Sequence, residues 1–427
     1  MMENVKSYLY YGYLPNSMKS HELKNFLFLN ENNIKDKKYI ADITDNNNEK
    51  ALIQQGINAL KAPYQNLPTN STHVLPLSGG LDSRAILGCL LEAGLKDQIV
   101  TVSFGTPGAL DYEIGHYVAK EMGVPHEKVD LTQIKINQGD LINVIKHGGS
   151  WTYLLDAFYN RLLVNQFGKD ATYWSGYMGE ALTGAHLPKE KSKTWDEAKQ
   201  YFCKRNRWTR SLNVLPEGIT PESFLPEKPL MNQDIISYDE QLDFAVRQHA
   251  CIKKIVLPSG YNYQTPFLHP EWVSFILNVP RKYRENQWLY KEILKTAFPK
   301  LFSLPTKTNI GLPLDAPQWQ RLIRRVDLRA RAAARRFLPG SSLDRNPMLN
   351  YIDFDGGLRS RLDLKEIVYD NIQDLKKRGT VDWIDMDSIW ERHQQRKGNY
   401  ADALLVLTSL EINLKVEDEQ REEDRSC

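Results

Sequence analysis

The sequence Ser-Gly-Gly-Leu-Asp-Ser at residues 78–83 constrains this chain most, because it separates two apolar segments of different character. Residues 74–77 have the pattern of a buried strand, and residues 85–91 have that of a helix that ends near Gly94. Glycine lets the backbone approach an anion closely, and the free N–H groups at a helix start favour negative charge. The segment therefore predicts a strand, a loop and a helix that bind an anionic group such as the pyrophosphate of a nucleotide.

Asp82 is the unexpected member of this loop, because a carboxylate repels phosphate. Its presence is explained if it binds a Mg²⁺ ion that bridges the phosphates. The loop lacks the Gly-Lys-Ser/Thr of the Walker sequence. The complete string resembles the PP-loop of the ATP pyrophosphatases, which cleave ATP to AMP and pyrophosphate while they adenylate a substrate. A purely structural Gly-Gly turn is the alternative.

The composition is that of an ordinary globular protein. The 427 residues are enough for two or three domains, and 41% of them are hydrophobic and 25% charged. The formal net charge is +2, so the overall charge gives no reason to expect a nucleic-acid or membrane partner.

The cysteines indicate a reducing compartment. Cys89, Cys203, Cys251 and Cys427 lie far apart and form no Cys-x-x-Cys pair, which argues against a zinc knuckle or a disulfide framework. The first residues contain no apolar leader segment, and no apolar run is long enough to span a bilayer. We therefore expect a soluble, cytoplasmic protein without a transmembrane segment.

Strand and helix patterns alternate through the first half of the chain. Further strands are expected at residues 99–104, 126–130 and 171–175, and helices at 111–122, 141–146 and 153–167. This alternation predicts an α/β fold with a parallel sheet, in which ligands bind beyond the carboxyl ends of the strands. Ser78, Phe104 and Gly176 all fall at such ends. Beyond residue 190 helical patterns dominate, at residues 195–206, 238–255, 270–277 and 289–296.

Four further segments resemble the synthetase domain of the asparagine synthetase family, in the same order and at compatible spacing. They are Ser103–Gly105 with Asp111, Ser175–Glu180, Thr265–His269, and Pro305–Lys307 with Gly311. The resemblance covers roughly residues 8–413. It implies a PP-loop core of the adenine-nucleotide α-hydrolase type with a helical C-terminal part, and ATP and Mg²⁺ as cofactors.

The resemblance also implies roles for individual residues. The nucleotide would be bound at Leu77, Ser78, Gly79, Gly80, Asp82, Ser83, Phe104, Ser175 and Gly176. Asp82 and Glu180 would bind Mg²⁺, although Glu180 stands where the family has Asp and could be a surface carboxylate at a helix start. Lys307 would stabilise charge on the α-phosphate or on the tetrahedral intermediate, and its alternative is a solvent-exposed loop lysine.

Tyr177 departs from the asparagine synthetases, which have a carboxylate at this position. It resembles β-lactam synthetase, in which a tyrosine and a nearby carboxylate remove a proton from the attacking amine. A phenol needs a partner to act as a base near neutral pH. His249 stands at about the right distance along the chain, with Glu240 and Asp243 further back. The alternative is that Tyr177 only packs over the nucleotide.

Three parts are expected along the chain. Residues 1–61 would form a small, irregular N-terminal module, a remnant of the junction after a glutaminase domain, with an Asn-rich loop at residues 45–48. Residues 62–413 would form the asparagine synthetase-like domain, and residues 414–427 a charged, disordered tail. The chain shows no N-terminal nucleophilic cysteine and no room for a glutaminase, so glutamine hydrolysis is not expected within it.

These features favour an ATP-dependent carbon–nitrogen ligase that forms AMP. The carboxylate could belong to a small molecule, a glycan or a peptide, and the nitrogen could come from free ammonia, from another protein or carrier, or from an amine of the substrate. Internal ring closure, as in β-lactam synthetase and the lasso-peptide cyclases, agrees with Tyr177. Amidation of a sugar acid or another small acid is equally compatible.

An arginine-rich segment leaves two other functions open. Its arginines are Arg321, Arg324, Arg325, Arg329, Arg331, Arg335 and Arg336. It predicts a solvated amphipathic helix, or else a surface for an acidic peptide, a charged sugar, a nucleic-acid backbone or a membrane. A tRNA-modifying PP-loop enzyme would use it for RNA, although the thiolating members need cysteine pairs that are missing here. A non-catalytic scaffold is the third possibility, against which the presence of Asp82 and Lys307 argues.

Overall fold

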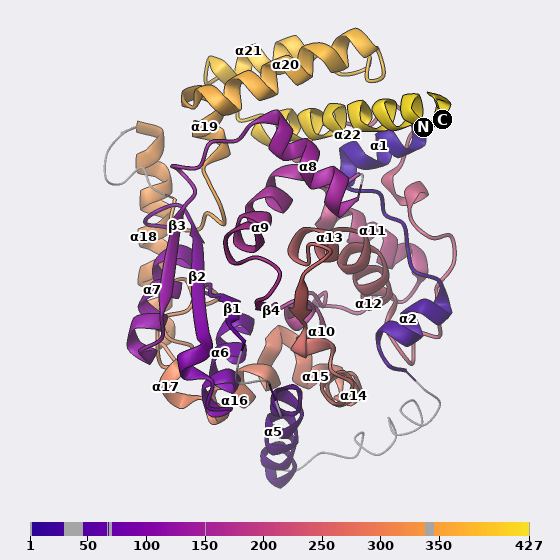
Figure 1. Cartoon of the computed structure of the whole chain (residues 1–427). Coiled ribbons are helices and arrows are strands. Elements are labelled where there is room, and N and C mark those ends of the chain that lie inside the picture. Colours follow the sequence, from indigo (N-terminus) through magenta and orange to yellow (C-terminus); the bar gives the residue numbers. More distant parts are fainter. Residues whose placement is uncertain are drawn as a thin grey trace.

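The computed structural model describes residues 2–29, 46–65, 67, 71–149, 151–337 and 346–426. Within these ranges a single sheet of five parallel strands has the order β3-β2-β1-β4-β5 (Figure 1). The strands are β1 (His73–Pro76), β2 (Ile99–Gly105), β3 (His126–Asp130), β4 (Thr172–Trp174) and β5 (Asn262–Gln264). The predicted α/β class and the first four strands are confirmed, whereas no pattern had indicated β5.

The centre of the sheet is apolar on both faces, as expected for parallel strands. Val74 in β1 pairs with Val100 in β2 and with Tyr173 in β4. The chain runs from β1 outward to β3 and then returns to place β4 on the other side of β1. Strand order therefore reverses between β1 and β4, and in such sheets a crevice for ligands opens at the carboxyl ends of these two strands.

Helices connect the strands where the sequence predicts them. They are α6 (Asp82–Glu92), α7 (Leu110–Met122), α8 (Gln138–Gly148) and α9 (Leu154–Phe167), and a short helix that was not predicted, α10 (Gly179–Thr183), follows β4. Gly123 ends α7 in the left-handed conformation with φ 65°, as its position after the helical pattern predicts.

The second half of the chain is helical. Its helices are α11 (Trp195–Asn206), α12 (Tyr238–Leu242), α13 (Lys253–Val256), α14 (Pro270–Asn278), α15 (Arg281–Arg284), α16 (Trp288–Ala297), α17 (Pro299–Phe302), α18 (Gln318–Phe337), α19 (Phe354–Ser360), α20 (Leu362–Arg378), α21 (Met386–Gln394) and α22 (Ala401–Ser426). Between α12 and α13 the helix continues as a π-helix at Asp243–Ile252. Such widened turns occur mainly near functional sites.

The first residues are not irregular where they are described. They form α1 (Met2–Tyr11), α2 (Ser20–Phe26) and α5 (Asn46–Lys61), so the expected Asn-rich loop starts at Asp45, outside the described residues, and continues as the first turn of α5. Tyr8, Tyr10 and Tyr11 are buried in α1, where the Tyr8 hydroxyl donates to the carbonyl of Thr152 (3.0 Å). Helix α1 packs against α22, and α5 packs against α14 and α16. Contacts with distant parts of the chain therefore stabilise these helices, although their sequences show no clear helical periodicity of apolar residues.

The expected disordered tail is also wrong where the structure describes it, because α22 continues to Ser426. Val416 is buried, and the Trp151 indole donates to the Glu417 carboxylate (2.6 Å). Arg378 of α20 donates to the Asp418 carboxylate (2.6 Å). These partners lie far away in the sequence, so composition alone indicated a solvated chain. Cys427 lies outside the described residues.

The arginine-rich segment forms the amphipathic helix α18, but its apolar residues face outward. Trp319, Leu322, Ile323 and Val326 are 57–63% exposed. On the inner side, Arg324 donates to the Ile310 carbonyl (3.2 Å). The side chains of Arg335 and Arg336 lie outside those that the structure describes. Among all described helices, none combines the length and the apolar character that a bilayer crossing requires.

Candidate active site

The predicted loop joins β1 to α6 and is held by its own serines. The Ser78 N–H donates to the Ser83 hydroxyl (3.2 Å), and the Gly80 N–H donates to the Ser78 hydroxyl (3.1 Å). No side chain caps the start of α6 at Leu81. The first N–H groups of α6 are therefore positioned for an anion at the crevice between β1 and β4.

Two distant segments close over this loop. The Gly79 N–H donates to the Asp111 carboxylate at the start of α7 (3.1 Å), and the Gly79 carbonyl accepts from the Lys307 N–H (2.8 Å). The Lys307 ammonium is paired with the Asp111 carboxylate and also donates to the Asn350 side chain. A Cβ atom at Gly79 would lie 2.9 Å from Lys307 Cβ, so glycine is required for this approach. The Lys307 ammonium is thus held beside the loop at residues 78–83 by Asp111 and Asn350.

Asp82 lies in a close-fitting cradle. A Cβ atom at Gly179 would lie 2.3 Å from an Asp82 carboxylate oxygen, and one at Gly176 would lie 2.9 Å from Asp82 Cβ. The Tyr290 hydroxyl donates to the Asp82 carboxylate (2.9 Å). Met178, between the two glycines, has a φ of 70°, a conformation that is uncommon outside glycine. The turn after β4 is therefore shaped around the Asp82 carboxylate.

Glu180 follows this turn and is joined to a buried histidine–aspartate pair. The His186 ring contacts the Asp243 carboxylate (2.7 Å) and lies 3.8 Å from the Glu180 carboxylate. Burial opposes the charged ring, but Asp243 outweighs it and raises the pKa of His186 above its usual value. The nearby imidazole in turn lowers the pKa of Glu180. Arg247, one helical turn beyond Asp243, lies 3.8 Å from that carboxylate.

The two predicted metal ligands face one cavity of about 300 Å³, together with Ser175, Gly176 and His186. Burial, together with the charge of Glu180, raises the pKa of Asp82 to about 8. Two carboxylates that repel one another in this way suit a divalent cation, and Mg²⁺ takes its remaining ligands from phosphate and water. The residues present therefore fit the ion that the sequence led us to expect.

The remaining nucleotide positions also lie at this edge. Leu77 follows β1 and is buried, and its carbonyl accepts from the Ser103 hydroxyl in β2 (2.6 Å). Phe104 stacks on Tyr351 with ring centroids 6.2 Å apart. Ser175 follows β4, and its N–H donates to the carbonyl of Gln264, the last residue of β5 (3.0 Å). The structure thus brings these positions to the carboxyl edge of the sheet, around the same crevice.

Tyr177 lines this cavity but is not arranged as a base. Its hydroxyl donates to the Gln248 carbonyl (2.9 Å), and the side chain is buried beside Phe26. Burial raises the pKa of Tyr177 far above its usual value. A phenol that already donates its proton and that resists ionisation is a poor proton acceptor.

His249 is not brought to this group. It lies in another cavity, lined by Leu14, Lys253 and Ser259 among others. Burial, with Lys253 nearby, lowers the pKa of His249. Its distance along the chain had suggested a partnership with Tyr177, but Tyr177 contacts the backbone carbonyl of Gln248 instead. The residue that lies beside Glu180 is His186, which in turn contacts Asp243. Nothing in the sequence had indicated His186.

A match to a known family covers strands β1 to β4 and the helices from α6 to α11, but not β5. Residues 73–216 match the family model described as asparagine synthase. No curated protein matches the chain.

Proposed function

Residues 73–216 belong to the asparagine synthase family of ATP-dependent amide-forming ligases, and from this membership we propose that the chain adenylates a substrate carboxylate and joins it to an amine or to ammonia. The observation that carries this proposal is the meeting of the residue 78–83 loop, the Asp111–Lys307 pair and the Asp82–Glu180 pair at one crevice. A phosphate-binding loop, a fixed cation and two metal-binding carboxylates are the groups that adenylation needs.

In the first step, a carboxylate oxygen of the substrate attacks the α-phosphorus of ATP and the bond to pyrophosphate breaks. The loop and the start of α6 bind the phosphates through backbone N–H groups. Lys307, which is held by Asp111 and Asn350, stabilises the charge that develops on the α-phosphate. Mg²⁺, bound by Asp82 and Glu180, would neutralise charge on the departing pyrophosphate.

In the second step, the amine nitrogen attacks the acyl carbon and AMP leaves. The amine loses a proton in this step, and the Tyr177 hydroxyl is a poor acceptor because it donates to the Gln248 carbonyl. We therefore assign Tyr177 a positioning role: it ties the turn after β4 to the π-helix that carries Asp243 and Arg247.

The test is the exchange of labelled pyrophosphate into ATP, with Mg²⁺ and a panel of amino acids, short peptides and sugar acids. We expect exchange with the wild-type chain, none with Asp82→Asn, and unchanged exchange with the surface control Asp196→Asn, whose side chain is 80% exposed. Formation of ADP instead of AMP, or full exchange in Asp82→Asn, would contradict the proposal.

A further inference from the structure

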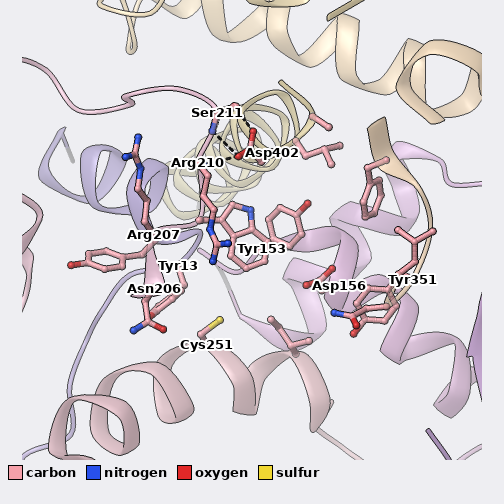
Figure 2. Close-up of a pocket in the computed structure, with 18 of the residues that line it drawn as sticks. Tyr13, Tyr153, Asp156, Asn206, Arg207, Arg210, Ser211, Cys251, Tyr351 and Asp402 are labelled. Atoms are coloured by element: carbon pink, nitrogen blue, oxygen red, sulfur yellow. Dashed lines mark hydrogen bonds between the residues drawn. The ribbon is translucent and has the colours of Figure 1, made fainter. Parts of the chain in front are cut away.

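A second and larger cavity has a volume of about 1000 Å³, and Figure 2 shows residues that line it. It lies among α9, the loop after α11, the π-helix, the segment before α19 and the start of α22. Its size is that of a site for a small ligand, at the upper end of the usual range. Tyr153, Trp208 and Tyr351 supply aromatic walls.

The cavity borders the candidate adenylation site on two sides. Arg247 and Ile252 line both cavities. On the other side, Asn350 accepts from Lys307, and Tyr351 stacks on Phe104. A molecule bound in the larger cavity can therefore reach the crevice that holds the candidate phosphate and metal ligands.

Several arginines line the cavity, and they differ in what they bind. Arg207 donates to the carbonyls of Thr209 and Leu212 (2.6 Å each), so it holds the loop after α11. Arg210 extends from this loop into the cavity (Figure 2). No hydrogen bond or ion pair joins the Arg210 guanidinium to another residue in the described ranges. A cation without a protein partner is thus presented to the cavity.

The carboxylates that line the cavity differ in the same way. Asp402 accepts from the N–H groups of Arg210 (2.6 Å) and Ser211 (3.0 Å), and Asp355 pairs with Arg359 (2.6 Å). Asp156 of α9, by contrast, has no hydrogen bond or ion pair with its side chain from any described residue. Its carboxylate points into the cavity near Tyr351 (Figure 2).

An anion and a cation therefore face one cavity, and neither has a hydrogen-bond or ion-pair partner among the described residues. A carboxylate inside a cavity is energetically unfavourable unless a cation or a hydrogen-bond donor pairs with it. The same holds for any other charged group that a bound ligand separates from water. A ligand with an amine at one end and an anionic group at the other would satisfy both, and the volume leaves space for a chain between them.

Resting on the proposed function, we propose that this cavity binds a peptide-sized zwitterionic substrate, whose amine pairs with Asp156 and whose carboxylate pairs with Arg210. Asp156 and Arg210 are then specificity-determining residues of the ligase. The aromatic side chains of the cavity pack against the apolar part of the substrate, and Arg247 lies where the substrate enters the adenylation site.

The test is affinity selection of peptides by the full chain. A synthetic mixture of tripeptides of the form X-X-Glu is offered with Mg²⁺ and ATP, and the retained molecules are identified by mass spectrometry after ultrafiltration. The same peptides are offered with an acetylated N-terminus, and again with both carboxyl groups amidated. Hexuronic acids form a fourth set.

We expect the wild-type chain to retain a subset of the free peptides, and their acetylated or amidated forms at least tenfold less. The Asp156→Asn variant should retain acetylated and free peptides equally. The Arg210→Gln variant should retain amidated and free peptides equally. The matched controls are Asp196→Asn and Arg329→Gln, at exposed positions away from the cavity. Retention of no peptide, equal retention of acetylated and free forms, or retention of hexuronic acids alone would overturn the inference.

ATP retained in the same samples separates the two proposals. If the wild-type chain and both variants retain ATP while no peptide is retained, only the inference on the substrate fails. If the wild-type chain retains no ATP, the proposed adenylation itself fails.

Discussion

The two neighbouring cavities differ in how their charged groups are satisfied. In the candidate adenylation site, Lys307, Asp111 and Asp82 each have protein partners, and a Cβ atom at Gly79, Gly176 or Gly179 would lie 2.9 Å or less from Lys307 or Asp82. In the larger cavity, Asp156 and Arg210 have no partner among the described residues. A site that binds the same group in every turnover can be rigid and complete, whereas a site that selects its ligand must leave charges for that ligand.

Asp82→Asn should have the largest effect on activity, and it should change activity and stability in opposite directions. AMP formation should fall at least about a thousandfold, because the charge of a metal ligand is lost. Without Mg²⁺, the variant should be more stable at pH 7. The pKa of Asp82 is raised to about 8 in the fold, so the wild-type chain must take up a proton on folding above the usual carboxyl pKa. Product analysis measures the loss of AMP formation, and urea unfolding measures the gain in stability. Lower stability of the variant would show that groups of the protein already stabilise the charged Asp82 carboxylate.

Lys307→Ala should lower AMP formation by roughly 100-fold to 1000-fold, as removal of one fixed charge-stabilising group does in other enzymes. Lys300→Ala is the matched control, because Lys300 is exposed and makes a single long contact with the Glu121 carbonyl (3.4 Å). Steady-state kinetics with saturating ATP are the measurement. An effect confined to the KM for ATP would assign Lys307 to ground-state binding instead.

Gly179→Ala tests the closeness of the cradle. The new Cβ atom would lie 2.3 Å from an Asp82 carboxylate oxygen, so the turn after β4 must move, at a loss of about 1–3 kcal/mol of stability. Gly105→Ala is the control, since its nearest neighbour would be 3.5 Å away. Thermal unfolding and pyrophosphate exchange should both respond to the first change and only weakly to the second. Similar behaviour of the two variants would mean that the cradle is loose.

Asp156→Asn tests the opposite property of the larger cavity. Burial raises the pKa of Asp156 to about 7, and the groups around it are the phenols of Tyr153, Tyr159 and Tyr351 and the thiol of Cys251. The wild-type fold is therefore penalised as pH rises from about 4 to above 7, and the asparagine variant is not. By the relation of about 1.4 kcal/mol per pKa unit, the gain at pH 8 is at most roughly 4 kcal/mol.

The difference in unfolding free energy between the two chains, measured at pH 5 and at pH 8, checks this expectation. It should grow with pH. A constant difference would show that Asp156 is hydrated by water that the cavity admits, and would weaken the contrast between the two sites.

Tyr177→Phe should have the smallest effect. It removes one hydrogen bond to the Gln248 carbonyl, worth about 1 kcal/mol, and should lower amide formation less than tenfold. A thousandfold loss of amide formation with normal adenylation would show instead that the Tyr177 hydroxyl accepts the proton from the amine.

Local sequence was sufficient for the parts of the molecule that depend on neighbours in the chain. Strand β1, the loop at residues 78–83 and α6 follow one another directly, so their apolar pattern and glycines predict them as a unit. The left-handed end of α7 at Gly123 follows from the same local rules. Strand β5 was missed because it has only three residues and is stabilised by pairing with β4 rather than by its own pattern.

Predictions that depended on which residues meet in space were less successful. His249 and Gln248 are adjacent in the chain, yet Tyr177 donates to the backbone carbonyl of Gln248, whereas the His249 side chain lines another cavity. The tail from residue 414 is charged enough to be disordered by composition, but Trp151 and Arg378 bind it.

By itself, the sequence determined the α/β class and the strand–loop–helix unit around residues 78–83, because these rest on patterns that are local in the chain, whereas the candidate metal and lysine positions followed from the family resemblance. Only the tertiary structure decided the surroundings of those groups: the cradle around Asp82, the pairing of Lys307 with Asp111, the His186–Asp243 pair and the unpartnered charges of the larger cavity. Burial and the distance between charges set these properties, and both arise from segments that are far apart in the chain.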